Sequence, residues 1–181
     1  EKAMNVYYSS SAVSPMEKHV YMSGFKGGYS KPIQWSKSKG TNDAEFSAGF
    51  QYCIMMHSDA NTPLDIKMID FKGKEIRSIE GNMALKEKLA KYELVKKEFF
   101  QFKNESGIAL NCWMMKPQHF DPNKKYPVLV AIYGGPGSNT VSDDWDGRGF
   151  LWHQMLCQEG YIVVRDRKST RLNSSHLVIS Y

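Results

Sequence analysis

A tyrosine that precedes a glycine- and proline-rich turn is the residue of this chain best placed for chemistry. Tyr133 is followed by Gly-Gly-Pro-Gly-Ser at 134–138, and it follows the apolar run VLVAI at 128–132. Such a run, bounded by Pro127 and a glycine cluster, is typical of a strand buried on both faces. Ligands in α/β enzymes bind at the carboxyl ends of such strands. Tyr133 can therefore donate a hydrogen bond to a substrate there, or it can simply pack against its neighbours.

The other groups that a hydrolase needs do not occur in the expected pattern. An α/β-hydrolase presents its nucleophilic serine in G-x-S-x-G, followed along the chain by an aspartate and a histidine. No such pentapeptide occurs in the 181 residues, and Ser138 lies in Pro-Gly-Ser-Asn instead. His119 falls in a predicted turn and His153 in a predicted helix, so we expect neither to act as the catalytic base. Tyr133 is therefore the one catalytic candidate.

The cysteines give no sign of a metal site. Cys53, Cys112 and Cys157 lie far apart, without the C-x-x-C or Cys/His spacing of a zinc site. Cys53 and Cys112 fall in apolar strand patterns and are expected to pack as small hydrophobic residues. We expect no metal and no cofactor, and cysteine usage does not define the compartment.

The last sixteen residues differ from the rest of the chain. Back-translation of DRKSTRLNSSH, residues 166–176, gives a nucleotide sequence that looks like a common short-read sequencing adapter. Residues 179–181 match the continuation of that adapter. We interpret residues 166–181 as an assembly artefact, expect them to be disordered, and exclude them from the fold. Arg165 lies at the junction and can belong to either side.

Charge and hydropathy exclude several classes of function. The chain carries 24 basic and 19 acidic residues, of which the artefactual segment holds three and one. The remaining net charge of +3 is scattered, so no nucleic-acid partner is expected. No apolar run approaches the length that spans a membrane. The chain begins at Glu1 with neither an initiator methionine nor a signal-like pattern, which favours a fragment.

The first part of the chain, residues 1–82, contains short strand patterns separated by turns. The strongest strand candidates are residues 5–8, 19–22, 50–56 and 64–69. Phe-Lys-Gly-Gly at 25–28 recurs as Phe-Lys-Gly-Lys at 71–74, each copy after a strand. An offset of 46 residues with several short strands per unit is typical of β-propeller blades. A piece of an ordinary β-sandwich is the alternative.

A helix and a change of pattern mark the expected domain boundary. Residues 82–92, NMALKEKLAKY, place their apolar side chains roughly on one face, with Asn82 as N-cap. A hairpin is predicted from strands at 95–103 and 108–115. Buried strands at 128–132 and 161–164 flank a predicted helix at 149–159. Strands followed by a strand–helix–strand unit indicate the beginning of an α/β domain.

These features together resemble the prolyl oligopeptidase family of serine peptidases, and especially its bacterial dipeptidyl peptidase IV-like members. The resemblance is carried by WMMKPQHFDPNKKYPVLV, YGGPGS, LWHQML and EGYIVV, in that order, and it covers essentially all of residues 1–164. It implies the last blades of a β-propeller in residues 1–82 and a linking helix at 83–93. It also implies the N-terminal part of an α/β-hydrolase domain at 94–165, with both domains incomplete.

The resemblance also implies an activity. Family members release dipeptides, often Xaa-Pro or Xaa-Ala, from the N-termini of peptides, and their tyrosine in YGGP or YAGP donates to the oxyanion. Tyr133 takes that role here, where a preorganised donor typically contributes roughly 10²–10³ in rate. The family's catalytic Ser, Asp and His fall beyond residue 164, and its acidic substrate-binding residues fall before Glu1. The fragment alone is expected to be inactive, with unknown substrate-binding residues of its own.

Peptides are the partners that the resemblance implies, together with a homodimer of the full-length parent and a periplasmic or cell-surface location. Two alternatives stay open: a non-enzymatic β-rich peptide-binding module, and another family member such as an acylaminoacyl peptidase or prolyl endopeptidase relative. A propeller needs about three or more repeats for stability. The sheet of the predicted α/β-hydrolase domain is expected to end at Val164 with an unpaired apolar edge. We therefore expect the fragment to be poorly soluble and marginally folded.

Overall fold

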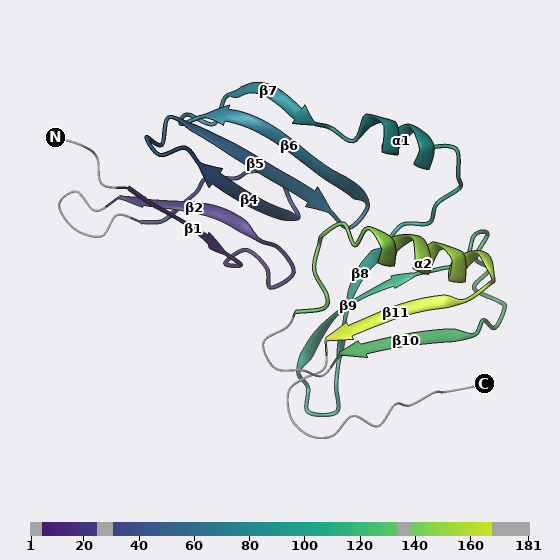
Figure 1. Cartoon of the computed structure of the whole chain (residues 1–181). Helices are drawn as coiled ribbons and strands as arrows, with labels where there is room; N and C mark the ends of the chain where they lie inside the picture. Colours follow the sequence, from purple (N-terminus) through teal and green to yellow (C-terminus); the bar gives the residue numbers. More distant parts are fainter. Residues whose placement is uncertain (1–4, 25–30, 134–138, 168–181) are drawn as a thin grey trace. The chain divides into compact units, whose positions relative to one another are not determined.

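The computed structural model describes residues 5–24, 31–133 and 139–167, which form three β-sheets and two helices (Figure 1). The chain divides into two units. Unit 1 consists of Glu1–Lys86 together with Ser142–Trp145, and unit 2 consists of Glu87–Val141 together with Asp146–Tyr181. The division after Lys86 falls inside helix α1 (Met83–Leu89).

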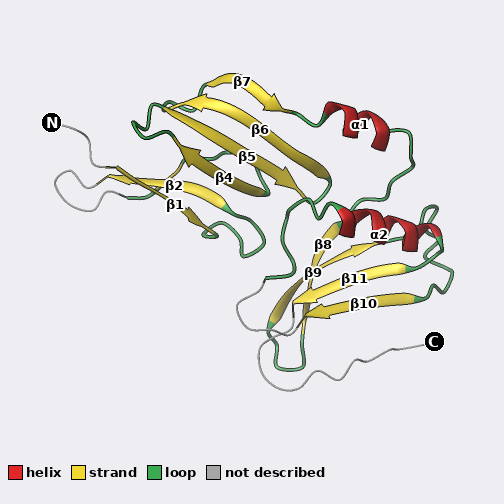
Figure 2. Ribbon diagram, in the orientation of Figure 1, coloured by secondary structure: helices red, strands yellow, loops and turns green. Residues whose placement is uncertain are grey.

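Unit 1 contains two antiparallel sheets (Figure 2). The first has the order β1-β2-β3, from β1 (Asn5–Ser10), β2 (His19–Gly24) and β3 (Ile33–Gln34). The second has the order β4-β5-β6-β7, from β4 (Thr41–Phe46), β5 (Tyr52–Asp59), β6 (Thr62–Asp70) and β7 (Glu75–Glu80). Four sequential antiparallel strands are the architecture of one propeller blade, so unit 1 is consistent with the predicted propeller.

An aromatic cluster joins the two sheets of unit 1. The Tyr7 ring on β1 lies 4.3 Å from the Phe46 ring on β4 and 5.6 Å from the Trp35 ring, measured between centroids. Phe50 stacks on Tyr7 at 5.9 Å. The contacts bury apolar surface between strands that are distant in sequence, which holds the first sheet against the second. Cys53 is buried in the same unit, as its apolar strand pattern predicted.

The strand predictions for residues 5–8, 19–22, 50–56 and 64–69 correspond to β1, β2, β5 and β6. Strands β3, β4 and β7 were not predicted, because their sequences IQ, TNDAEF and EIRSIE carry no run of apolar residues. Every residue of β7 is exposed. The second copy of the repeat forms the turn between β6 and β7, where Gly73 has φ 82°. The first copy lies in residues 25–30, outside the described residues.

Unit 2 contains one mixed sheet with the order β10-β11-β9-β8. Its strands are β8 (Glu98–Lys103), β9 (Ala109–Met115), β10 (Val128–Tyr133) and β11 (Ile162–Arg167). Strands β10 and β11 are parallel, and helix α2 (Arg148–Gln158) lies between them in sequence. Strand β9 pairs antiparallel with both β11 and β8. The buried side chains of Cys112, Trp113, Met115 and Val163 form the core of this sheet.

Three expectations for the second half need correction. Strand β11 continues to Arg167, two residues into the segment expected to be disordered, because β10 pairs with it as far as Arg167 and β9 as far as Asp166. Val164 lies inside the sheet, and the apolar edge strand is β10 instead. Helix α1 ends at Leu89, whereas the linking helix was expected to reach residue 93. At the predicted N-cap, the Asn82 carbonyl accepts from Lys86 N–H, and the Asn82 side-chain amide donates to the Leu64 carbonyl.

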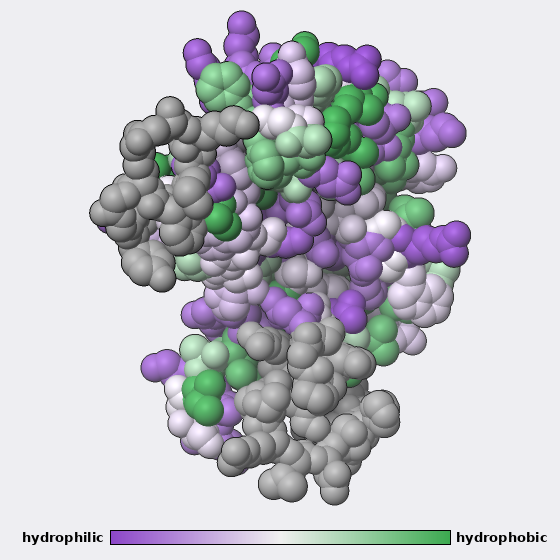
Figure 3. Space-filling model, turned by 60° about the vertical axis from the view of Figure 1, so that its left-hand side comes forward, coloured by the Kyte–Doolittle hydropathy of each residue, from purple (hydrophilic) through white to green (hydrophobic). Residues whose placement is uncertain are grey.

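Apolar side chains interrupt the polar surface at several places on the face shown in Figure 3. Strand β10 contributes four of the exposed apolar residues, namely Val128, Leu129, Val130 and Ile132. Over the described ranges, neither helix has the length and apolar character needed to cross a membrane.

Candidate active site

The predicted oxyanion donor lies at the end of a strand, as the sequence indicated. Tyr133 is the last residue of β10, and its backbone is in register with Arg167 of the parallel strand β11. The pairing of these two strands begins at Pro127, whose carbonyl accepts a hydrogen bond from Ile162 N–H at 2.9 Å. Tyr133 therefore lies at the carboxyl end of a parallel pair, the position where α/β proteins bind ligands. Residues 134–138, including Ser138, lie outside the described residues.

The chain entering β10 is held by a tyrosine. The Tyr126 hydroxyl accepts a hydrogen bond from Asp121 N–H at 2.9 Å, and the Tyr126 ring packs on Phe120 with centroids 5.1 Å apart. The Asp121 side chain also accepts from Asn123 N–H, which closes the turn before the strand. These contacts fix the start of β10 and thus the strand that carries Tyr133.

Helix α2 is attached to unit 2 by a buried glutamine. Gln154 Oε1 accepts from Val95 N–H at 2.9 Å, and Gln154 Nε2 donates to the Val95 carbonyl at 2.6 Å. The amide thus pairs with one backbone residue in the way a neighbouring strand would. Because Gln154 is buried, both bonds are shielded from water and hold the helix in register with the segment before β8.

The two histidines that the sequence analysis set aside occupy different environments. His153 is buried on α2 with its ring against Trp113 of β9, and burial lowers the pKa of His153. Its Nδ1 atom is buried without a hydrogen-bond partner. His119 lies in the exposed turn before β10 with φ 55°. That neither acts as the catalytic base stays a prediction.

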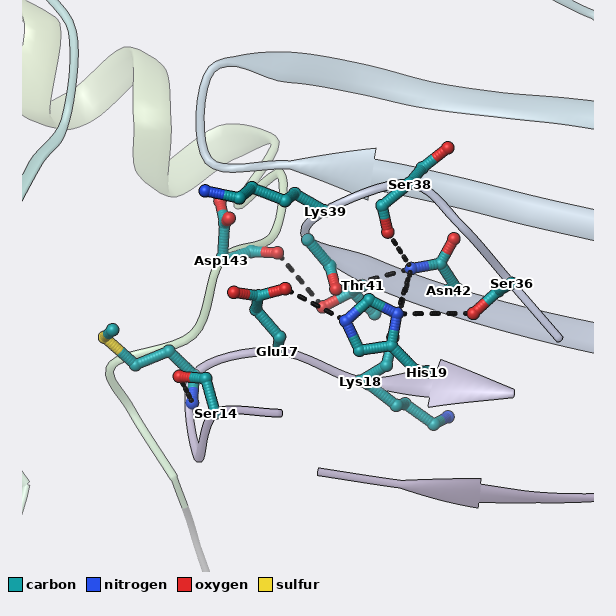
Figure 4. Close-up of polar contacts among 12 residues, drawn as sticks. Ser14, Glu17, Lys18, His19, Ser36, Ser38, Lys39, Thr41, Asn42 and Asp143 are labelled. Atoms are coloured by element: carbon teal, nitrogen blue, oxygen red, sulfur yellow. Dashed lines mark hydrogen bonds and ion pairs between the residues drawn. The ribbon is translucent and has the colours of Figure 1, made fainter. Parts of the chain in front are cut away.

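A constellation that resembles a catalytic triad occurs in unit 1, where no sequence motif predicted it (Figure 4). His19 Nε2 lies 2.9 Å from a Glu17 carboxylate oxygen, and His19 Nδ1 lies 3.3 Å from Ser36 Oγ. The Gln34 amide nitrogen also approaches His19 Nδ1, at 3.1 Å. An amide NH₂ can only donate, so Nδ1 accepts and the proton is on Nε2, which donates to Glu17.

Burial excludes that constellation from catalysis on an external substrate. Ser36 is 4% exposed and His19 2% exposed, so no peptide carbonyl can reach the serine oxygen. Ser36 Oγ already accepts a hydrogen bond from Val20 N–H at 3.0 Å. Asn42, also buried, extends the network by donating to the carbonyls of Lys18 and Ser38. The network instead satisfies polar groups between β2, the segment after β3 and β4.

A second feature missed by the sequence analysis is the place of residues 142–145. Asp143 lies between β10 and α2 in sequence, yet it belongs to unit 1. Its N–H donates to the Met16 carbonyl at 2.7 Å, and its carbonyl accepts from the Thr41 hydroxyl at 3.1 Å. Its Oδ1 atom accepts from Ala60 N–H at 2.8 Å. Burial, with the nearby carboxylates, raises the pKa of Asp143.

Within residues 5–24, 31–133 and 139–167, no group of three His, Cys, Asp or Glu side chains could hold a metal ion. Cys53, Cys112 and Cys157 are buried, and none forms a disulfide within the described part of the chain. Burial raises the pKa of Cys53 and of Cys157 to about 11, so these thiols are protonated near neutral pH.

Comparisons with known proteins find that this chain is similar to dipeptidyl peptidases. No protein-family model matches it. Dipeptidyl peptidase 4 of Arthroderma otae is 35% identical over 150 residues, which are 82% of this chain and 19% of the relative. A probable dipeptidyl-aminopeptidase B of Paracoccidioides lutzii is 32% identical over 164 residues, 88% of this chain and 17% of the relative. The crystal structure of Porphyromonas gingivalis dipeptidyl peptidase 4 matches with a TM-score of 0.82 and 39% identity.

The chain belongs to the dipeptidyl peptidase 4-like members of the prolyl oligopeptidase family. It spans about a fifth of the length of the curated relatives it matches. The match to the P. gingivalis peptidase covers 90% of this chain and 22% of that one. The membership that the YGGPGS and EGYIVV segments predicted is therefore confirmed.

Proposed function

We propose that the chain is one part of a serine-type dipeptidyl peptidase, which releases Xaa-Pro or Xaa-Ala dipeptides from the N-termini of peptides. The observation that carries this proposal is the structural match to P. gingivalis dipeptidyl peptidase 4. That match includes 90% of the chain at 39% identity, so it extends over both units. If the chain were only a peptide-binding module, unit 1 would suffice for binding and the presence of unit 2 would have no explanation.

In this proposal the two units belong to two different domains. Unit 1 supplies the last blades of a β-propeller, because its second sheet is a sequential four-stranded antiparallel meander. Unit 2 begins an α/β-hydrolase domain. Its parallel pair β10 and β11, with α2 between them in sequence, is a βαβ unit, the repeating element of such domains.

Tyr133 is the oxyanion donor of the proposed peptidase. Attack on a peptide carbonyl builds negative charge on its oxygen, and a preorganised donor at that oxygen stabilises the transition state. The backbone of Tyr133 is fixed by pairing with β11, and the start of its strand is fixed through Tyr126. The nucleophile, aspartate and histidine are supplied by parts of the peptidase outside this chain, so the chain alone is inactive. A homodimer of the parent remains a prediction from the family resemblance.

The experiment is steady-state kinetics of the complete parent peptidase and its Tyr133→Phe variant on chromogenic Gly-Pro and Gly-Ala dipeptide substrates. The variant keeps the ring and loses only the donor. We expect kcat to fall roughly 10²–10³-fold, with KM changed much less, because the donor acts in the transition state. Tyr92→Phe is the matched control, because Tyr92 is exposed and lies outside any strand.

Two results would overturn the proposal. Absence of dipeptide release from both substrates by the folded parent protein would contradict the activity. Equal kcat values for Tyr133→Phe and the unchanged peptidase would contradict the role of Tyr133 while leaving the activity in place. A further measurement uses the 181-residue chain alone with either substrate. We expect it to form no product above the uncatalysed rate.

A further inference from the structure

The hairpin between β8 and β9 carries a three-residue motif that the proposed activity does not use. Asn104, Glu105 and Ser106 read Asn-x-Ser without proline at the middle position, which is the acceptor motif for N-linked glycosylation. No other asparagine of residues 1–165 has serine or threonine two positions later. Because a glycan is bulky, such a motif can act as an acceptor only where the structure places it on an open loop.

The hairpin turn places this motif in solvent. It joins β8, which ends at Lys103, to β9, which begins at Ala109. Glu105 and Ser106 are exposed, and Ile108, the last residue of the turn, is 54% exposed. The structure therefore supplies the surface loop that the motif requires.

The turn fixes Asn104 without using its side-chain nitrogen. Asn104 N–H donates to the Ile108 carbonyl at 3.0 Å, and the Asn104 carbonyl accepts from Gly107 N–H at 2.9 Å. Asn104 Oδ1 accepts from Ile108 N–H at 2.9 Å. This last bond orients the side-chain amide through its oxygen, and it does not occupy Nδ2, the atom to which a glycan is attached.

The geometry of the turn does not account for the serine. The hydrogen bonds of the turn join Asn104 to Gly107 and Ile108, and Gly107 adopts the left-handed conformation with φ 74°. Asparagine and glycine at such positions are ordinary turn residues. None of these bonds uses the Ser106 hydroxyl, which is the group that distinguishes an acceptor motif from a turn alone.

We propose that Asn104 is the acceptor of an N-linked glycan, and that the parent protein is exported to the compartment where this modification takes place. Asn104 Nδ2 attacks the anomeric carbon of a lipid pyrophosphate-linked oligosaccharide. The new bond joins that carbon to nitrogen, and the amide loses one proton. The bond from the carbon to the pyrophosphate oxygen breaks, and the lipid pyrophosphate leaves with the electron pair. This inference does not depend on the proposed peptidase activity.

The test is mass spectrometry of peptides from the complete parent protein, isolated from its source organism. We expect the peptide that contains Asn104 to show a mass increase made of monosaccharide units. Treatment with peptide-N-glycosidase should remove this increase and leave aspartate at position 104. Asn123 is the internal control, because it is exposed in a turn but is followed by two lysines, and it should stay unmodified.

Three variants of the parent, read out on the same peptide, test the motif itself. Asn104→Asp keeps an oxygen that can accept from Ile108 N–H and removes the nitrogen, so the turn should persist while the glycan is lost. Ser106→Ala leaves Asn104 in place and should also abolish the modification. Ser106→Thr should retain it, because threonine satisfies the motif.

An unmodified Asn104 in the parent protein would overturn the proposal. A mass increase that resists peptide-N-glycosidase and maps to the Ser106 oxygen would overturn it as well, as would one that persists in Asn104→Asp or Ser106→Ala. The first of these results is read on the unchanged protein, so it is decisive even if a variant fails to fold.

Discussion

The ring of His153 meets the ring of Trp113 edge-on, with centroids 5.1 Å apart and planes at 64°. This contact joins helix α2 to strand β9 inside unit 2. The ammonium group of Lys97 lies over the same Trp113 ring, 5.1 Å from its centroid. A titratable ring is therefore buried beside an aromatic ring that also binds a cation, which makes the attachment of α2 sensitive to protonation.

The first prediction concerns acid sensitivity. The pKa of His153 is lowered mainly by burial and further by Lys97 and Arg165, against an opposing effect of Asp146. The unfolded chain therefore takes up the proton first as pH falls below about 6.5, and unit 2 loses stability there. His153→Phe cannot be charged, so its melting temperature should fall less between pH 7.5 and pH 5.

Thermal unfolding of the parent peptidase at several pH values provides the measurement. His119→Asn is the control, because residue 119 is exposed and asparagine tolerates its φ of 55°. Parallel pH profiles for His153→Phe and the unchanged protein would contradict the assignment of acid sensitivity to this buried ring.

The second prediction concerns the close approach of β4 and β5. Gly40 has φ 97°, and a Cβ atom there would meet the carbonyl oxygen of Ser58 and the backbone of Asp59. Gly40→Ala should destabilise unit 1 by about 2–3 kcal/mol, from backbone strain and from the displaced neighbours. Gly73→Ala, at φ 82° with open space around it, should cost only about 1 kcal/mol. Denaturant unfolding compares the two, and equal losses would show that the contact with Ser58 is unimportant.

The third prediction separates the triad-like residues of unit 1 from catalysis. Ser36→Ala should cost about 1–2 kcal/mol, because Val20 N–H loses its buried acceptor. It should leave kcat of the parent peptidase unchanged. A fluorophosphonate probe should form no adduct on the peptide that contains Ser36, as mass spectrometry of the labelled protein can show. An adduct at Ser36 would mean that the serine is reachable and activated.

The fourth prediction concerns the edge strand of unit 2. Among the described strands, β10 pairs with β11 alone, and Val130 is 44% exposed. Unpaired apolar edges promote strand-to-strand association. The 181-residue chain should therefore aggregate, and Val130→Lys should reduce light scattering at equal concentration. Tyr92→Lys, which changes an exposed residue outside any strand, is the control. A monomeric, cooperatively unfolding chain would contradict this prediction.

The sequence predicted those elements whose residues carry an apolar period, and it missed those that owe their structure to partners. Strands β5 and β10 have apolar runs and were predicted. Strand β7, EIRSIE, forms because β6 offers it backbone hydrogen-bond partners. Its side chains are all exposed, so its sequence carries no apolar pattern that predicts the strand. The continuation of β11 to Arg167 has the same origin, since backbone pairing does not depend on side-chain type.

The site was predictable only where one local motif contains it. Tyr133 could be proposed as a candidate because the apolar strand and the glycine-rich turn adjoin it in sequence. Asp143 could not, because its partner Ala60 lies 83 residues away and nothing in the segment SDDW distinguishes it. The network of His19 and Ser36 was missed for the same reason, as its members are separated by 17 residues.

The measurement that tests the central claim most directly is the sequence of the source gene across codon 164, followed by expression of the full reading frame. We predict that the frame continues from Val164 into a G-x-S-x-G pentapeptide with a later aspartate and histidine, and that the product releases Xaa-Pro dipeptides. A gene that encodes DRKSTRLNSSHLVISY and then stops would contradict this account, because the protein would have no nucleophile.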